Sequence, residues 1–151
     1  MVSQNELLEY ATNELKRRGF RKKAKRWTKI TNDFTLVFFV QGSQWDKETY
    51  YIRPGVFIND ISSTEDYYGH FYTEIAQDSI EQIFNDLDSF YNNWTDKATI
   101  KKTAVDFLRW EKRNPLEKRR AGKVEYKTDP VPDPVMLAVR PPVIDYIIKN
   151  Y

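Results

Sequence analysis

Apolar residues concentrate in the run over residues 36–40, which is the most hydrophobic stretch of the chain. They occupy both faces of an extended segment, as expected for a strand that is covered on both sides and lies inside a sheet. A buried helix is the competing interpretation, but the short run and its β-branched and aromatic content favour a strand. The pattern therefore predicts a central strand over residues 34–41.

A second strand is predicted from Tyr50 to Ile58, and it contains Pro54 followed by Gly55. Proline cannot donate a hydrogen bond to a neighbouring strand, so this segment is expected at an edge of the sheet or at a bulge. Shorter strands are expected over residues 26–31 and 70–75.

A first helix is predicted over residues 4–18 from the helical spacing of its apolar residues. Ser3 and Glu6 have the spacing of a capping box, and Gly19 supplies a left-handed stop.

Three further helices are predicted in the second half of the chain. The second helix begins at Asp78 or Ser79. The third runs from about residue 95 and ends before Pro115, and a short last helix starts at Pro141. The second helix carries a strong apolar stripe at helical spacing: Ile80, Ile83, Phe84, Leu87, Phe90, Tyr91 and Trp94.

Together these elements predict an α+β fold, with an antiparallel sheet of about four strands and helices packed mostly on one face. The 151 residues are of single-domain size, and the 15% aromatic content is typical of a packed globule. Five of the seven prolines lie between Pro130 and Pro142. We therefore expect an extended proline-rich segment over residues 122–142, within one domain of residues 1–151.

The chain has no cysteine, which excludes disulfides, thiolate metal sites and cysteine nucleophiles. The first residues lack the basic start and apolar core of a signal peptide. No apolar run approaches the roughly 20 residues that span a bilayer. We therefore expect a cytoplasmic protein that does not interact with membranes.

Charge is distributed in blocks, although the formal net charge is only +2. Residues 16–29 contain nine basic side chains and no acidic one, whereas residues 46–96 contain eleven acidic side chains and two basic ones, Lys47 and Arg53. Such blocks create opposed surface fields if they are also separated in space. Solvated helix and loop faces are the simpler interpretation.

No pattern in the sequence specifies a catalytic site, a cofactor or a metal. His70 is the single histidine, and neither a Gly-x-Ser-x-Gly motif nor a phosphate-binding glycine loop is present. Carboxylates are plentiful, but nothing places two of them at the separation that glycoside hydrolysis or Mg²⁺ binding requires. We expect no enzymatic activity and no cofactor, and a hydrolase that uses acidic residues stays an alternative.

Three short motifs follow one another in the first half of the chain: LKRRGFRKKAKRW at residues 15–27, QGSQW at 41–45 and YYIRPGVF at 50–57. Their order resembles the bacterial DUF4304 family, a domain of unknown function. The resemblance covers residues 7–58, and the helices to about Trp110 are compatible with it. It implies an α+β fold without an established activity, and some members resemble immunity proteins of bacterial toxin systems. The family usually has an asparagine where this chain has Arg53.

Our preferred hypothesis is a non-enzymatic protein-interaction module, immunity-like in the sense that it binds a basic toxin or another protein. An acidic face rich in aromatic residues suits such a partner, because charge steers the encounter and aromatic side chains anchor it. The predicted contact residues lie between positions 45 and 68: Trp45, Asp46, Glu48, Tyr51, Arg53, Asp60, Glu65, Asp66, Tyr67 and Tyr68.

Nucleic acid is the alternative partner. The basic residues 16–29, interleaved with Phe20 and Trp27, could contact phosphates and stack on bases. The acidic middle of the chain nearly cancels this charge and no RNA-binding signature is present, so the sequence argues against nucleic acid.

Overall fold

The computed structural model describes residues 2–61, 68–133 and 141–151. The chain divides into two compact units, Met1–Thr95 and Asp96–Tyr151, and each is described by itself. The single domain over residues 1–151 stays a prediction.

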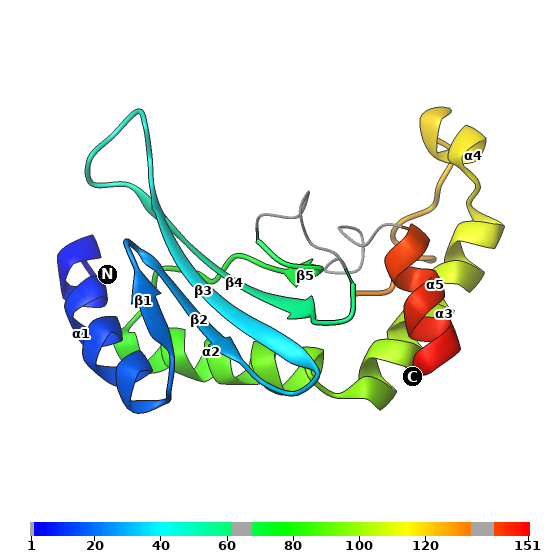
Figure 1. Cartoon of the computed structure of the whole chain (residues 1–151). Helices are drawn as coiled ribbons and strands as arrows, with labels where there is room; N and C mark the ends of the chain where they lie inside the picture. The colour runs from blue at the N-terminus through cyan, green and yellow to red at the C-terminus, as the bar shows by residue number, and fades with distance from the viewer. Residues whose placement is uncertain (1, 62–67, 134–140) are drawn as a thin grey trace. The chain divides into compact units, whose positions relative to one another are not determined.

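The first unit is built on an antiparallel sheet of five strands in the order β1-β2-β3-β4-β5 (Figure 1). The strands are β1 (Arg21–Lys23), β2 (Arg26–Ile30), β3 (Phe34–Gly42), β4 (Tyr50–Ile58) and β5 (Phe71–Tyr72). The predicted α+β fold is confirmed, with five strands where about four were expected. The additional strand is β1, a run of three exposed basic residues at one edge.

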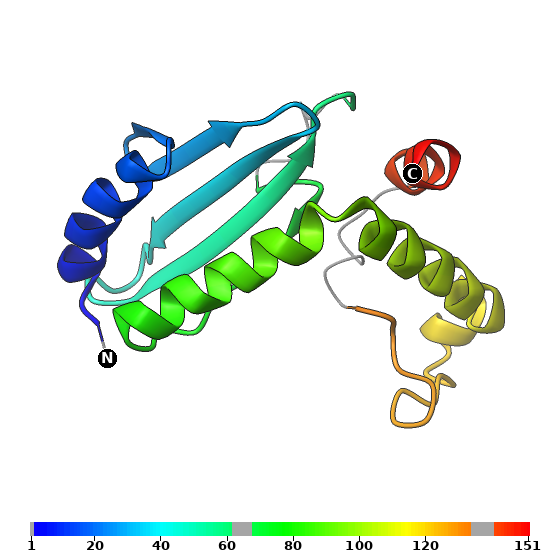
Figure 2. The same cartoon turned by 90° about the horizontal axis from the view of Figure 1, so that it is seen from below.

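Two helices, α1 (Gln4–Arg17) and α2 (Ile80–Trp94), pack against this sheet. Helix α2 runs along one face, as seen from below (Figure 2). The Tyr91 hydroxyl donates a 2.6 Å hydrogen bond to the Val37 carbonyl, and Phe84 lies 6.0 Å from Phe38 between ring centroids. Helix α1 packs beside β1 and joins α2 through Tyr10, whose ring meets Phe84 edge-on at 5.0 Å. Both helices therefore bury their apolar stripes on the same side of the unit.

Local signals set the ends of these helices. Ser3 and Ser79 are the N-caps, and their hydroxyls accept the main-chain N–H groups of Glu6 and Gln82, each at 3.2 Å. Gly19 follows α1 with a φ of +91°, a conformation that glycine adopts without a Cβ penalty. The predicted N-cap at Ser3 and the helix stop at Gly19 are both present, and the Glu6 carboxylate accepts a 3.2 Å hydrogen bond from the Ser3 hydroxyl.

Strand β4 lies between β3 and β5, so the prediction that Pro54 marks an edge or a bulge is wrong. Its register with β3 is continuous from Phe34↔Ile58 to Gly42↔Tyr50. The Pro54 carbonyl accepts the Thr73 N–H at 3.2 Å, so the proline nitrogen also faces the β5 side. The missing N–H therefore weakens only the pairing with the short β5 and leaves the ladder to β3 intact.

The second unit contains α3 (Lys97–Arg113), α4 (Leu116–Arg120) and α5 (Pro141–Asn150). Helices α3 and α5 pack together. Their buried residues are Ile100, Ala104, Phe107, Trp110, Val143, Ile144 and Ile147. Residues 122–133 of the proline-rich segment form turns and irregular structure.

Asp129 ties this segment to α3. Its carbonyl accepts the Trp110 indole N–H at 2.9 Å, and its carboxylate accepts hydrogen bonds from Arg113 at 2.8 Å and from Asn114 at 2.9 Å. Because the charged form accepts these bonds, first of all those from Arg113, the pKa of Asp129 falls to about 2.

Among the described helices, none combines the length and the apolar composition needed to cross a membrane.

Candidate binding site on the open face of the sheet

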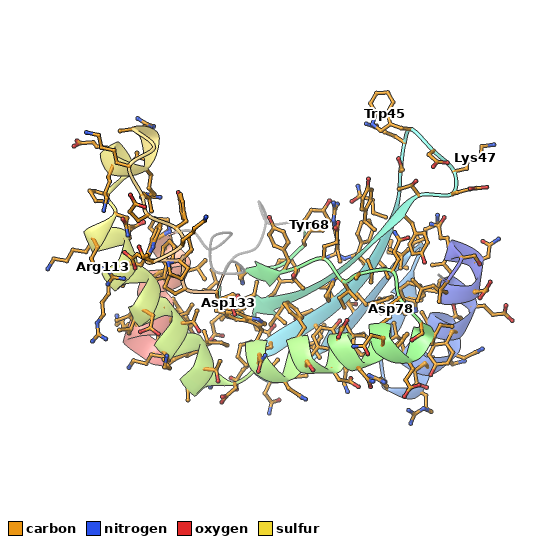
Figure 3. The ribbon with its side chains drawn as sticks, turned by 180° about the vertical axis from the view of Figure 1, so that it is seen from behind. Trp45, Lys47, Tyr68, Asp78, Arg113 and Asp133 are labelled. Carbon is orange, nitrogen blue, oxygen red and sulfur yellow. The ribbon has the colours of Figure 1, made fainter. Side chains whose placement is uncertain are left out.

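Side chains alternate between the two faces of β3 and β4. Phe38 contacts α2, so Phe39 and Gln41 point to the opposite face, together with their cross-strand partners Arg53 and Tyr51. Figure 3 shows Tyr68 on this same side of the sheet, away from α2. We define the tyrosine–arginine face as Gln41, Tyr51, Arg53, Tyr68, Tyr72 and Glu74.

Arg53 is the centre of this face. Its guanidinium carbon lies 4.9 Å from the ring centroid of Tyr51 and 5.3 Å from that of Tyr68. Its Nη1 donates to Gln41 Oε1 and, at 3.2 Å, to the Tyr68 hydroxyl, while its Nη2 donates to Glu74 Oε1 at 3.4 Å. Two aromatic rings and three acceptors therefore hold the planar guanidinium in one orientation.

Tyr68 contributes both its side chain and its main chain. Its hydroxyl donates to Gln41 Oε1 at 3.0 Å, and its ring packs against Phe39 and Tyr72, at 6.0 Å and 5.5 Å between centroids. Its main-chain carbonyl passes directly over Gly55, where a Cβ would lie 1.6 Å from the carbonyl oxygen. A glycine at position 55 is therefore required for Tyr68 to reach the face.

A pocket of about 390 Å³ opens beside Arg53, at the end of the face next to the β3–β4 loop. Its lining residues come from the end of β3, the loop and β4: Gln41, Gly42, Ser43, Gln44, Trp45, Tyr51 and Arg53. Trp45 is 89% exposed and stands at the tip of the loop (Figure 3). The pocket thus joins a positioned cation to an uncovered aromatic ring.

Asp46 shapes the loop that carries Trp45. Its carboxylate accepts the Glu48 N–H at 3.0 Å and the Thr49 hydroxyl at 2.7 Å, and the Ser43 hydroxyl accepts the Trp45 N–H at 3.1 Å. The bond from Thr49, followed by that from Glu48, lowers the pKa of Asp46. Asp46 therefore stays ionised and serves the loop conformation.

The structure brings four of the predicted contact residues together, namely Trp45, Tyr51, Arg53 and Tyr68. Asp60 lies in the turn that follows β4, at the opposite end of that strand from the Trp45 loop. The predicted contact residues Glu65, Asp66 and Tyr67 lie outside the described residues, and their role stays a prediction.

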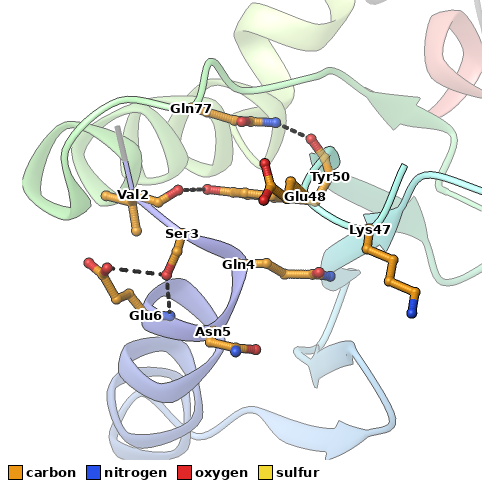
Figure 4. A pocket seen from close by; sticks show the side chains of 9 residues that line it. All are labelled: Val2, Ser3, Gln4, Asn5, Glu6, Lys47, Glu48, Tyr50 and Gln77. Atoms are coloured by element: carbon orange, nitrogen blue, oxygen red, sulfur yellow. Dashed lines mark hydrogen bonds between the residues drawn. The ribbon is translucent and has the colours of Figure 1, made fainter. Parts of the chain in front are cut away.

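Glu48 lines a different pocket, of about 400 Å³, at the start of α1 (Figure 4). There the Tyr50 hydroxyl donates to the Val2 carbonyl, and the Gln77 side-chain amide donates to the Tyr50 carbonyl. Glu6 and Lys47 complete its charged lining. These hydrogen bonds tie the start of the chain and the residues before α2 to β4, which is a structural role.

His70 is buried, with 1% of its surface exposed. Its Nδ1 accepts the Ile58 N–H at 2.8 Å, and its ring meets Phe57 edge-on at 5.3 Å. It therefore helps to hold the residues before β5 against the end of β4. Across residues 2–61, 68–133 and 141–151, no three acidic or histidine side chains are grouped to hold a metal ion.

The basic block of residues 16–29 is divided between the two faces of the sheet. Lys22 lies over the Trp27 ring on the helix side, and Arg18 forms ion pairs with Glu14 at 3.0 Å and Asp88 at 2.6 Å. The register instead places Lys23 and Arg26 in one cross-strand row with Phe39 and Arg53 on the open face. Part of the basic block therefore shares a face with Arg53.

Sequence reasoning missed Gln41, Tyr72 and Glu74 as members of the face. Gln41 is the cross-strand partner of Tyr51, and Tyr72 is the partner of Gly55. The strand register is the signal that would have found them, since directly opposed residues share a face.

The architecture defines an α+β protein whose antiparallel sheet is covered by helices on one face and carries a tyrosine–arginine cluster on the other. Residues 11–109 match the family described as "Domain of unknown function (DUF4304)", and the chain belongs to this family. The match includes the whole sheet, α2, the second half of α1 and most of α3. No curated protein and no solved structure matches the chain.

Proposed function

We propose that this protein is a non-enzymatic protein-interaction module that binds its partner through the tyrosine–arginine face and Trp45. The observation that carries the proposal is the convergence of Trp45, Tyr51, Arg53 and Tyr68 on the side of the sheet opposite α2. Tryptophan, tyrosine and arginine are the residue types that dominate the binding energy of protein interfaces.

The geometry of these side chains supports binding. Arg53 is already held between two tyrosine rings, so little side-chain freedom remains to be lost when a partner binds. Trp45 projects from a loop that Asp46 and Ser43 stabilise by hydrogen bonds, and its large ring is open to solvent. An exposed tryptophan beside an oriented arginine offers both an apolar anchor and a polar one.

The acidic residues near the face favour an immunity-like form of the same proposal. Asp46 and Glu48 belong to the loop that carries Trp45, and Glu74 lies beside Arg53. Negative charge around an aromatic contact surface would steer a basic protein, such as a toxin, toward it. The lack of cysteine supports a reducing compartment, and we place the interaction in the cytoplasm.

Co-purification from cells of the native host tests the proposal. The wild-type protein is compared with the double variant Trp45→Ala/Tyr51→Ala and with Ile30→Ser, quantified by mass spectrometry. Ile30 is the last residue of β2, at the end of the strand away from Trp45, and its side chain is 78% exposed, so Ile30→Ser serves as the matched control. We expect one stoichiometric protein that the double variant loses and the control retains. The proposal is wrong if the double variant retains every protein that the wild type binds.

Nucleic acid is a second candidate, and one observation favours it. Lys23, Arg26 and Arg53 share a cross-strand row with the aromatic Phe39, an arrangement suited to phosphates and stacked bases. A titration with single-stranded oligonucleotides at increasing salt tests this candidate, since phosphate contacts make affinity fall steeply with ionic strength. Absence of binding at low salt would exclude it.

A further inference from the structure

The pocket beside Arg53 carries a single charge. Among its lining residues Arg53 is the one charged side chain, and the others are neutral: Gln41, Gly42, Ser43, Gln44, Trp45 and Tyr51. The pocket therefore combines a cation with hydrogen-bonding groups and two aromatic rings, and it favours an anionic ligand.

The donors in this pocket are already oriented. Within the described residues, Nη1 of Arg53 donates to Gln41 and Tyr68, and Nη2 donates once to Glu74. The Nε–H and one N–H of Nη2 are left for a ligand. Gln41 Oε1 accepts from both Arg53 and Tyr68, so the amide N–H groups of Gln41 are the part of this side chain that can donate to a ligand.

We infer that this pocket binds a carboxylate presented by the partner protein, with Arg53 as the charged donor, Gln41 as a neutral donor and Trp45 packed against the adjoining residues of the partner. The inference rests on the proposed interaction function and names the chemistry that the partner must offer. A planar guanidinium matches a carboxylate with two parallel hydrogen bonds, and such pairs are roughly twice as strong as neutral ones.

The charges around the pocket favour a protein over a nucleic acid as the source of the anion. Asp46 follows Trp45 on the loop that forms its wall, and the Glu74 carboxylate lies 3.4 Å from Arg53. A nucleic acid strand carries a negative charge on every nucleotide and would meet these carboxylates. A peptide with one carboxylate between basic residues would meet complementary charge at each of these positions.

Peptide titrations followed by ¹⁵N-detected NMR test the inference. Three short lysine-flanked peptides are compared: one with a central aspartate and an amidated end, one with asparagine in its place, and the asparagine peptide with a free C-terminal carboxylate. The signals followed are the Arg53 Nε–H, the Gln41 amide and the Trp45 indole. We expect saturable shifts of these signals with a peptide that carries a carboxylate. The amidated asparagine peptide, which carries none, should bind with about tenfold lower affinity. The peptide that binds identifies a side-chain or a C-terminal carboxylate as the source.

Variants establish which group recognises the carboxylate. Arg53→Gln removes the charge and should abolish the difference in affinity between peptides with and without a carboxylate. Arg53→Lys keeps the charge but loses the two parallel hydrogen bonds, so it should retain only part of that difference. Ile30→Ser should bind as the wild type does. Thermal unfolding of each variant checks that the fold is retained.

Three results would overturn the inference: equal affinity for all three peptides, unchanged affinity in Arg53→Gln, or tighter binding of single-stranded oligothymidylate than of any peptide. The outcome is separable from that of the co-purification experiment. A natural partner that is lost from Trp45→Ala/Tyr51→Ala but retained by Arg53→Gln would uphold the interaction function and reject the carboxylate pocket.

Discussion

The main-chain carbonyl of Tyr68 lies so close over Gly55 that a Cβ built at position 55 would be 1.6 Å from its oxygen. This contact lets the Tyr68 main chain pass over the sheet and brings the Tyr68 ring to Arg53. The site therefore depends on a residue that has no side chain of its own.

Gly55→Ala is expected to destabilise the protein. The atom that a methyl group would meet belongs to the main chain, so relief requires Tyr68 to move, and we expect a loss of about 2–3 kcal/mol in the free energy of unfolding. Gly42→Ala is the matched control, because a Cβ there meets only the far ends of side chains, at 3.7 Å or more. Urea unfolding of both variants measures the effect, and equal stabilities would contradict the prediction.

The buried hydroxyl of Tyr91 is expected to contribute to the packing of α2 on the sheet. Tyr91→Phe removes the 2.6 Å hydrogen bond to the Val37 carbonyl and should cost about 1–2 kcal/mol of unfolding free energy. Tyr126→Phe, at an exposed tyrosine, should change stability little. A loss no larger in Tyr91→Phe than in Tyr126→Phe would show that the bond contributes nothing measurable.

Acid should weaken the second unit through Asp129. Its pKa of about 2 in the folded state is below the value of about 3.9 expected when unfolded, so its contribution is present above pH 4. It is lost as the pH falls from about 4 through about 2. Urea unfolding at pH 7, 4 and 2.5 should show a smaller loss on acidification for Asp129→Asn than for the wild type.

Glu14 also contributes to acid sensitivity, so the urea-unfolding experiment at low pH needs a Glu14 variant as a control. Its pKa is also lowered to about 2, chiefly by hydrogen bonds from Arg17 and then Arg18, so its acid dependence has the same sign. Glu14→Gln should therefore remove a different part of the pH dependence, in the first unit. If Asp129→Asn loses as much stability as the wild type between pH 4 and 2.5, Asp129 does not have the role that its contacts indicate.

Trp45 should be removable without harm to the fold. Because it is 89% exposed, Trp45→Phe should change the free energy of unfolding by no more than about 0.5 kcal/mol. The other three tryptophans are buried, so the substitution should remove most of the fluorescence quenching by acrylamide. Quenching that is unchanged in Trp45→Phe would mean that the ring is covered in solution.

The helices were predictable because their signals are local. Ser3 and Ser79 cap α1 and α2 through hydrogen bonds that span three residues, and the stripe from Ile83 to Trp94 is buried as its spacing indicates. The short α4, by contrast, has no buried residue and therefore no apolar stripe that could have revealed it.

The candidate binding site was predictable only in part. Trp45, Tyr51 and Arg53 stood out as aromatic or charged residues beside a strand, but Gln41 became part of the site through its register with Tyr51. The position of β4 was also mispredicted, because the sequence shows that Pro54 lacks an N–H but not which neighbour that nitrogen faces.

The amino-acid sequence by itself determined the fold class, the ends of α1 and α2 and the burial of β3, since capping, helical spacing and an apolar run act between residues close in the chain. Only the tertiary structure decided that Arg53 lies between Tyr51 and Tyr68, that Gly55 admits the Tyr68 main chain and that the basic block is split between two faces. These relationships depend on strand register and on segments that meet across the sheet. A shift of register by one residue would turn every one of these side chains to the other face.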